Sequence, residues 1–152
     1  SAGAAVNLKN TIVAGNADLT TTGTVEPDCS GTLTSQGYNL IGAVSAGCTI
    51  GVDATNVIGQ SANLGPLALN APGTTKTHAL LDGSPAIDAG SPDCPPPATD
   101  QRGEPRAQGS ACDIGAYESP FAATPTPVAT PTPTRKIHAE RFVRITGVAK
   151  RR

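Results

Sequence analysis

Asn39-Leu40-Ile41-Gly42 is the stretch that decides the fold, because its pattern recurs along the chain. Each copy places a polar residue before an isoleucine and then a small residue. The central isoleucines are separated by 29, 17, 29 and 27 residues. Repeats of roughly 20–50 residues are typical of solenoids, in which each repeat adds one coil. The copies are Asn10-Thr11-Ile12-Val13, Asn39-Leu40-Ile41-Gly42, Asn56-Val57-Ile58-Gly59, Ser84-Pro85-Ala86-Ile87-Asp88-Ala89-Gly90 and Cys112-Asp113-Ile114-Gly115-Ala116-Tyr117-Glu118.

The composition favours short strands and turns over helices. The 152 residues suffice for one domain with a tail. Aromatic residues make up 3%, and Trp and Met are absent, so the core must consist of small aliphatic side chains. The 17 glycines and 14 prolines predict frequent turns.

Strand-forming residues occur in runs of two to five that end at Gly, Asn, Asp or Pro. We therefore predict an all-β fold, a parallel β-helix (solenoid) with a C-terminal capping block, over residues 1–118. A Thr/Pro-rich linker is expected at 119–134, held extended by its prolines. A basic tail, disordered or a single strand, is expected at 135–152. The predicted strands are 5–8, 10–13, 32–35, 38–41, 49–50, 57–58, 78–81, 86–87 and 116–117.

Three asparagines head the repeated motif, namely Asn10, Asn39 and Asn56. Asparagine tolerates left-handed backbone geometry, and its amide can bond the next amide one coil away. We expect the three to stack as a ladder at one corner. The alternative is that each asparagine simply forms a turn at a strand start.

The chain has four cysteines, Cys29, Cys48, Cys94 and Cys112, without zinc-binding spacing. Three disulfide connectivities exist for four cysteines. We favour Cys29–Cys48 and Cys94–Cys112, because each pair closes a loop of coil size. Disulfides indicate an oxidising compartment. The alternative is four free thiols in a cytosolic protein.

The net charge of −1 hides an asymmetry. Residues 1–134 hold four basic and eleven acidic residues, a net of −7, whereas residues 135–152 hold seven basic residues and one acidic residue, a net of +6. The tail fits a solvated end, a strand that pairs with another surface, the start of a further module, or an electrostatic contact with the cell surface. The acidic body argues against nucleic acid as a partner.

The densest polar block lies near the end of the predicted solenoid. We expect Arg102 to bond Asp88 or Asp113 and so close the solenoid end, which otherwise exposes unpaired backbone. Acid/base catalysis by the same carboxylates is the alternative. Calcium binding by Asp88, Asp100 and Asp113 is a weaker hypothesis, because no known calcium repeat is present. A lone His78 does not indicate catalysis. The predicted cap residues are Asp88, Asp100, Arg102, Asp113 and Glu118; no catalytic residue and no cofactor are assigned.

Several motifs in order resemble one bacterial family. They are Asp100-Gln101-Arg102-Gly103, the two repeats that begin at Ser84 and Cys112, Gly37-Tyr38-Asn39-Leu40-Ile41-Gly42 and Thr77-His78-Ala79-Leu80-Leu81. Together they resemble the C-terminal coils of choice-of-anchor Q domain proteins, within the pectate-lyase-like superfamily, over residues 8–118. The resemblance implies a right-handed parallel β-helix on a surface protein whose anchor follows the domain. The basic tail departs from this pattern, since it is no recognisable anchor.

We therefore expect a non-catalytic extracellular or cell-surface module, structural or adhesive, which contacts carbohydrate or assembles with itself. One alternative is the end of a polysaccharide lyase or hydrolase. A second is a filament subunit that stacks head to tail. The expected partners are envelope or matrix polymers and further copies of the chain. No apolar stretch is long enough for a membrane span, and no signal peptide is visible. The chain opens inside a predicted coil, so earlier coils are expected upstream.

Overall fold

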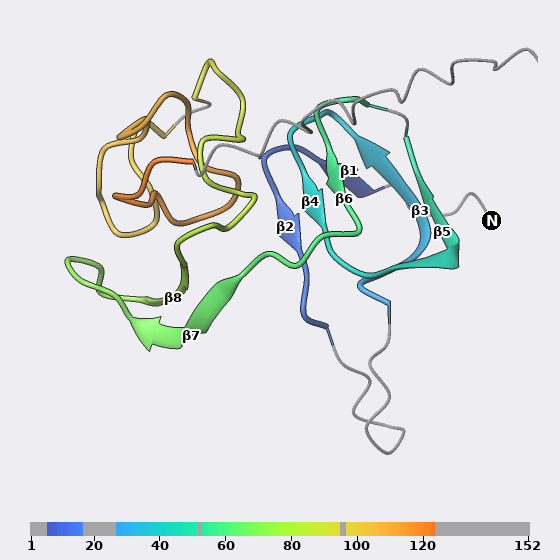
Figure 1. Ribbon diagram of the computed structural model, residues 1–152, viewed down its shortest axis with the longest axis horizontal. Helices are drawn as coiled ribbons and strands as arrows, with labels where there is room; N and C mark the ends of the chain where they lie inside the picture. The colour runs from blue at the N-terminus through green and yellow to red at the C-terminus, as the bar shows by residue number, and fades with distance from the viewer. Residues whose placement is uncertain (1–5, 17–26, 52, 95–96, 124–152) are drawn as a thin grey trace, which may run out of the picture.

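Short strands in three small sheets make up the regular structure (Figure 1). The computed structural model describes residues 6–16, 27–51, 53–94 and 97–123, and these residues form no helix. The chain is all-β, as predicted. The strands of the described residues are β1 (Val6–Leu8), β2 (Ile12–Val13), β3 (Cys29–Ser35), β4 (Leu40–Ile41), β5 (Val44–Ile50), β6 (Val57–Ile58), β7 (Leu64–Leu69) and β8 (Lys76–Leu80).

The first six strands form two parallel sheets, which we call the parallel half (residues 6–58). One sheet has the order β1-β3-β5 and the other β2-β4-β6, so the chain alternates between them. In the second sheet Ile12 pairs with Leu40, and Leu40 pairs with Val57. The motif copies are therefore in register between β4 and β6, whereas β2 is shifted by one residue, since Ile12 pairs with Leu40 and not with Ile41.

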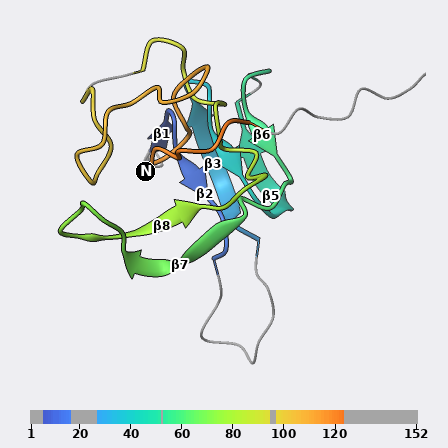
Figure 2. The same cartoon turned by 60° about the vertical axis from the view of Figure 1, so that its left-hand side comes forward.

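The predicted right-handed parallel β-helix is wrong. Parallel pairing is confined to the parallel half, and the next two strands, β7 and β8, pair antiparallel as a separate hairpin. Residues 82–123, the C-terminal block, hold an isolated bridge between Thr99 and Pro105 but no strand within the described residues. In Figure 2 the hairpin runs beside β2 without continuing either parallel sheet. The solenoid prediction treated every isoleucine motif as a coil, but the later copies are turns.

The later motif copies form no strand, although the N–H of Ile114 in the last copy donates to the carbonyl of Ala86 in the copy before it. In the copy at 84–90, the N–H of Ile87 donates to the carbonyl of Ser84, and Asp88 has a left-handed φ of 55°. In the last copy Gly115 has a φ of 101°, which favours glycine. The strands predicted at 86–87 and 116–117 are therefore turns.

Strand β7 was not predicted, because its sequence contains Pro66. Proline removes a ladder donor and is tolerated at edges or irregularities. The register between β7 and β8 shifts between Leu64 and Leu67, so Pro66 lies within the irregular part of the pair. Leu67 then pairs with His78 on β8.

The hydrophobic core lies where the parallel half, the hairpin and the C-terminal block meet. Leu40 comes from β4, Leu80 from β8, and Ile87 and Ile114 from the block, and all four are buried. Ile58, by contrast, is 42% exposed on the outer strand β6. The motif isoleucines thus correctly mark core positions in the block, although they do not mark strands there.

The predicted tail, residues 135–152, and residues 124–134 of the predicted linker lie outside the described residues. The boundary predicted after residue 118 is not tested.

Candidate functional site

The turn at Asp100 orders the first part of the site. One carboxylate oxygen of Asp100, Oδ1, accepts the N–H of Arg102 at 2.7 Å and the N–H of Glu104 at 3.1 Å. Aspartate commonly stabilises turns in this way. Gly103 has a φ of 90°, which an L side chain rarely adopts. The Asp-Gln-Arg-Gly sequence therefore forms a turn that presents Arg102 inward.

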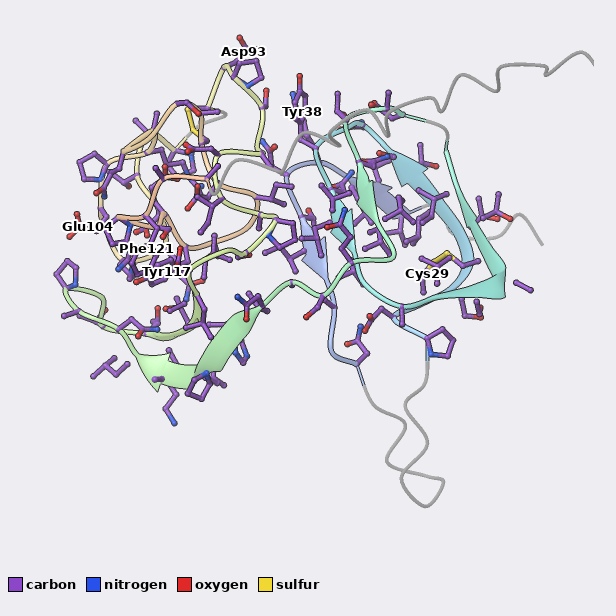
Figure 3. All side chains as sticks on the ribbon, viewed as in Figure 1. Cys29, Tyr38, Asp93, Glu104, Tyr117 and Phe121 are labelled. Carbon is purple, nitrogen blue, oxygen red and sulfur yellow. A yellow bond between two sulfur atoms is a disulfide. The ribbon has the colours of Figure 1, made fainter. Side chains whose placement is uncertain are left out.

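The Arg102 guanidinium joins three segments of the chain. Its Nε and Nη2 lie 2.8 Å from Oδ2 of Asp100. Nη2 also donates to the carbonyl of Glu118 at 2.6 Å, and Nη1 donates to the carbonyl of Ala71 at 3.3 Å. The guanidinium lies 3.6 Å from the centre of the Tyr117 ring, a cation–π contact. Arg102 thus ties the hairpin turn to the C-terminal block, whose Tyr117 is labelled in Figure 3.

The partner of Arg102 differs from the prediction. Within the described residues its carboxylate partner is Asp100, not Asp88 or Asp113. The reason is local, because the Asp100 turn brings Arg102 back over the same carboxylate. Asp88 and Asp113 bind backbone amides instead.

Glu118 is fully buried and acts as a backbone acceptor. Its Oε1 accepts the N–H groups of Ala107 and Gln108 at 2.9 and 3.1 Å. Its Oε2 accepts the N–H of Asp113 at 3.2 Å and lies 3.6 Å from Nη1 of Arg106. One side chain thus holds two separate loops of the C-terminal block.

Asp113 and Asp88 extend this arrangement. Oδ1 of Asp113 accepts the N–H of Asp88 at 2.8 Å, and Oδ2 accepts the N–H of Ser119 at 2.5 Å. Asp88 in turn accepts the N–H groups of Ala111 and Ala123 at 3.1 and 2.9 Å. We call Asp88, Asp100, Arg102, Asp113 and Glu118 the carboxylate lock.

The pKa values within the lock move in opposite directions. Burial raises the pKa of Asp113 to about 6, against the hydrogen bonds from Asp88 and Ser119. Burial also opposes ionisation of Asp100, but the N–H of Glu118 and the Arg102 side chain outweigh it, so that pKa is lowered. The pKa of Asp88 is likewise lowered, since bonds from backbone N–H groups outweigh its burial.

The carboxylate lock stabilises a block in which the described residues form no strand. Its oxygens bond backbone N–H groups that no sheet satisfies, and leaving such groups unpaired costs about 1–3 kcal/mol each. The described residues contain no group of three or more His, Cys, Asp or Glu side chains arranged for a metal ion. The calcium hypothesis therefore gains no support from the geometry of Asp88, Asp100 and Asp113.

The asparagine ladder forms between two of the three predicted members. The side-chain carbonyl of Asn56 accepts the backbone N–H of Asn39 at 3.0 Å and its Nδ2 at 3.2 Å. Oδ1 of Asn39 accepts the N–H of Thr11 at 3.0 Å. Asn10 lies one position earlier in the register, and its Oδ1 accepts the N–H of Ser91 at 2.9 Å. Asn10 therefore links the parallel half to the C-terminal block and is not part of the ladder.

Both disulfides have the connectivity favoured by the sequence. Cys29–Cys48 joins β3 to β5, and Figure 3 shows it beside those strands. Cys94–Cys112 lies within the C-terminal block. No helix that could cross a membrane is found in the described part of the chain.

A cleft of about 580 Å³ opens between β2, the hairpin and the C-terminal block. Apolar side chains from all three parts line it, including Ile12, Leu67 and Ile114. Basic and polar residues complete the lining, and sequence reasoning did not group them because they come from distant segments. They include Lys76, His78, Gln101 and Arg106.

No protein-family model, curated protein or solved structure matches the chain.

Proposed function

We propose that this chain is a non-catalytic structural or adhesive module of an extracellular or cell-surface protein. The observation that carries the proposal is the carboxylate lock. Its acidic side chains are committed to backbone amides and Arg102, so their oxygens serve the fold rather than a substrate. Glu118 and Asp113, 0% and 2% exposed, offer no surface for acid/base chemistry.

The disulfides support an extracellular location. All four cysteines are paired, and such bridges persist in oxidising compartments. The resemblance of several motifs to choice-of-anchor Q domain proteins also favours an extracellular location. Membership of that family stays a prediction. Contact with envelope or matrix polymers is part of this proposal.

Retention on cell envelopes tests the adhesive role. The oxidised chain, fused to a fluorescent protein, is mixed with washed bacterial envelopes and sedimented. We expect it to sediment with the envelopes, and we expect prior reduction of both disulfides to abolish this. Fluorescent protein alone is the control. Equal sedimentation of the fusion and this control contradicts an adhesive role.

A turnover assay tests the non-catalytic part. The chain is incubated with neutral and acidic polysaccharides, with and without calcium, and new reducing ends and unsaturated uronates are measured. We expect no release above buffer. Release that disappears in Asp113→Asn but persists in the exposed control Asp93→Asn would assign a catalytic role to the lock and overturn the proposal.

A further inference from the structure

The cleft beside β2 has an unusual charge for this molecule. The described residues belong to a body that carries a net of −7 over residues 1–134. Yet the acidic and basic residues lining the cleft among the described residues are all basic, namely Lys76, His78 and Arg106. Lys76 and His78 are exposed on β8, whereas Arg106 is largely buried, donates to the carbonyl of Gly115 and is paired with Glu118, so the ammonium group of Lys76 is the accessible charge. The cleft is therefore suited to a ligand that carries negative charge.

One wall of the cleft is the outer edge of β2. The carbonyls of Thr11 and Val13 accept N–H groups from Leu40 and Gly42 and thus face β4. Alternation along a parallel strand turns the N–H and C=O of Ile12 to the opposite side, where the cleft lies. An extended backbone placed there can continue the sheet, which is the mode of strand addition.

The residues that line the cleft can contact the side chains of such an added strand. Leu67 is 55% exposed and, with the half-buried Leu64 and Ile12, supplies apolar surface. Nδ1 of His78 donates to the carbonyl of Gly65 at 2.8 Å, which fixes the orientation of the imidazole ring on this strand. Lys76, on the same strand, offers an ammonium group to a carboxylate.

We propose that this cleft binds an extended acidic polypeptide segment, which adds to the edge of β2. The N–H and C=O of Ile12 favour a polypeptide over a sugar, next to the Asn10 carbonyl, which already accepts the N–H of Gly115. Sugar recognition relies on open aromatic faces, and one face of Tyr117 is already covered by Arg102. The inference rests on the proposed non-catalytic role and names the chemical class of its partner.

A defined probe tests this. It is a fluorescein-labelled heptapeptide of alternating valine and glutamate, acetylated and amidated at its ends, and binding is followed by fluorescence anisotropy. We expect saturable binding that weakens as salt rises, because exposed charges are screened. A lysine-for-glutamate version and a version N-methylated at alternate residues should bind at least about tenfold more weakly, since they lack the charge or the main-chain donors.

Matched substitutions locate the probe. Lys76→Gln should weaken binding about threefold, as expected for an exposed ion pair, while Lys9→Gln, which removes the same charge outside the cleft, should not. Leu67→Ala should weaken it about fivefold by loss of apolar contact, whereas the more exposed Leu69→Ala, outside the cleft lining, should leave it unchanged.

Three outcomes overturn the inference: no saturable binding, equal effects of the cleft and control substitutions, or preference for a galacturonate oligosaccharide over the peptide. Loss of probe binding with envelope retention intact refutes this inference alone. Loss of envelope retention with probe binding intact refutes the adhesive proposal alone.

Discussion

Asp100 illustrates how a carboxylate can replace a sheet as the partner of backbone amides. Its two oxygens together accept the N–H groups of Arg102, Glu104 and Glu118, and the Arg102 side chain neutralises it. The Arg102 and Asp100 side chains are 7% and 0% exposed. Removing one member of a buried, bonded pair leaves the other uncompensated, which is costly.

Arg102→Ala should therefore lower the free energy of unfolding by about 3–5 kcal/mol. Lysine at the same position lacks the planar guanidinium and cannot bond Asp100, Ala71 and Glu118 together. The free energy of unfolding of Arg102→Lys should therefore lie between those of the parent and Arg102→Ala. Urea unfolding measures both, with exposed Lys9→Ala as the control. A parent-like midpoint for Arg102→Ala would refute a role in the lock.

Asp113 predicts an unusual dependence of stability on pH. Its folded-state pKa of about 6 lies above the ordinary value of 3.8, so the folded chain binds the proton more tightly than the unfolded chain. Asp113 therefore stabilises the fold below pH 4, and this contribution is lost as pH rises to about 6. The upper limit is about 3 kcal/mol.

Urea unfolding of the parent between pH 4 and 7 should show this decline, and Asp113→Asn should flatten it. The lowered pKa values of Asp88 and Asp100 act in the opposite direction but below pH 4, because their contributions are lost as pH falls through those values. Equal slopes for parent and variant between pH 4 and 6 contradict the assignment.

At the scale of elements, the chain shows what its motifs could predict. The apolar character of Ile41, Ile87 and Ile114 predicts that they are buried. All three are buried, whether they lie in a strand or in a turn. Strand formation did not follow, because a turn can also bury an isoleucine when carboxylates satisfy its amides. The disulfide pairing was accessible from loop length. The carboxylate partner of Arg102 and the cleft could not be predicted from the sequence, since they depend on how the hairpin and the C-terminal block pack.

Strand β5 is an edge strand of seven residues without charge or proline. Such edges are templates for pairing with another chain, which a lysine blocks. Thr49→Lys should therefore reduce self-association, measured by light scattering over a concentration series. Thr32→Lys is the matched control, because it adds the same charge on the central strand β3, where Thr32 pairs with Thr49 of β5. Equal effects of the two variants would attribute any change to net charge alone.

The Cys94–Cys112 disulfide closes a separation of 18 residues in a block whose described residues form no strand. Replacing both cysteines by serine should lower the free energy of unfolding by about 3 kcal/mol, chiefly by freeing the unfolded chain. Urea unfolding under oxidising conditions measures this. A parent-like stability would mean that the carboxylate lock alone holds the block.

At the scale of the whole molecule, the charge asymmetry predicts a role for the tail. Residues 135–152 carry a net of +6 and residues 1–134 a net of −7. We expect the tail to contact the acidic body of a neighbouring copy or an anionic envelope polymer. Deleting 135–152 should lower self-association or envelope retention at low salt and leave the melting temperature unchanged. The effect should shrink as salt rises, because the Debye length falls to about 8 Å near physiological ionic strength. Unchanged association and retention at low salt would leave the tail as a solvated end.

The placement of the two disulfides has a consequence for how the chain responds to mechanical tension. Each closes a loop within its own part, Cys29–Cys48 in the parallel half and Cys94–Cys112 in the C-terminal block. Between those parts lie packed side chains and the hydrogen bonds that the N–H groups of Ser91 and Gly115 donate to Asn10. Mechanical tension along the chain would therefore load these bonds before either covalent loop. Under shear the molecule would lengthen as the parallel half separates from the C-terminal block. The two disulfide-closed loops would stay closed, and the two parts could pack together again when the load falls.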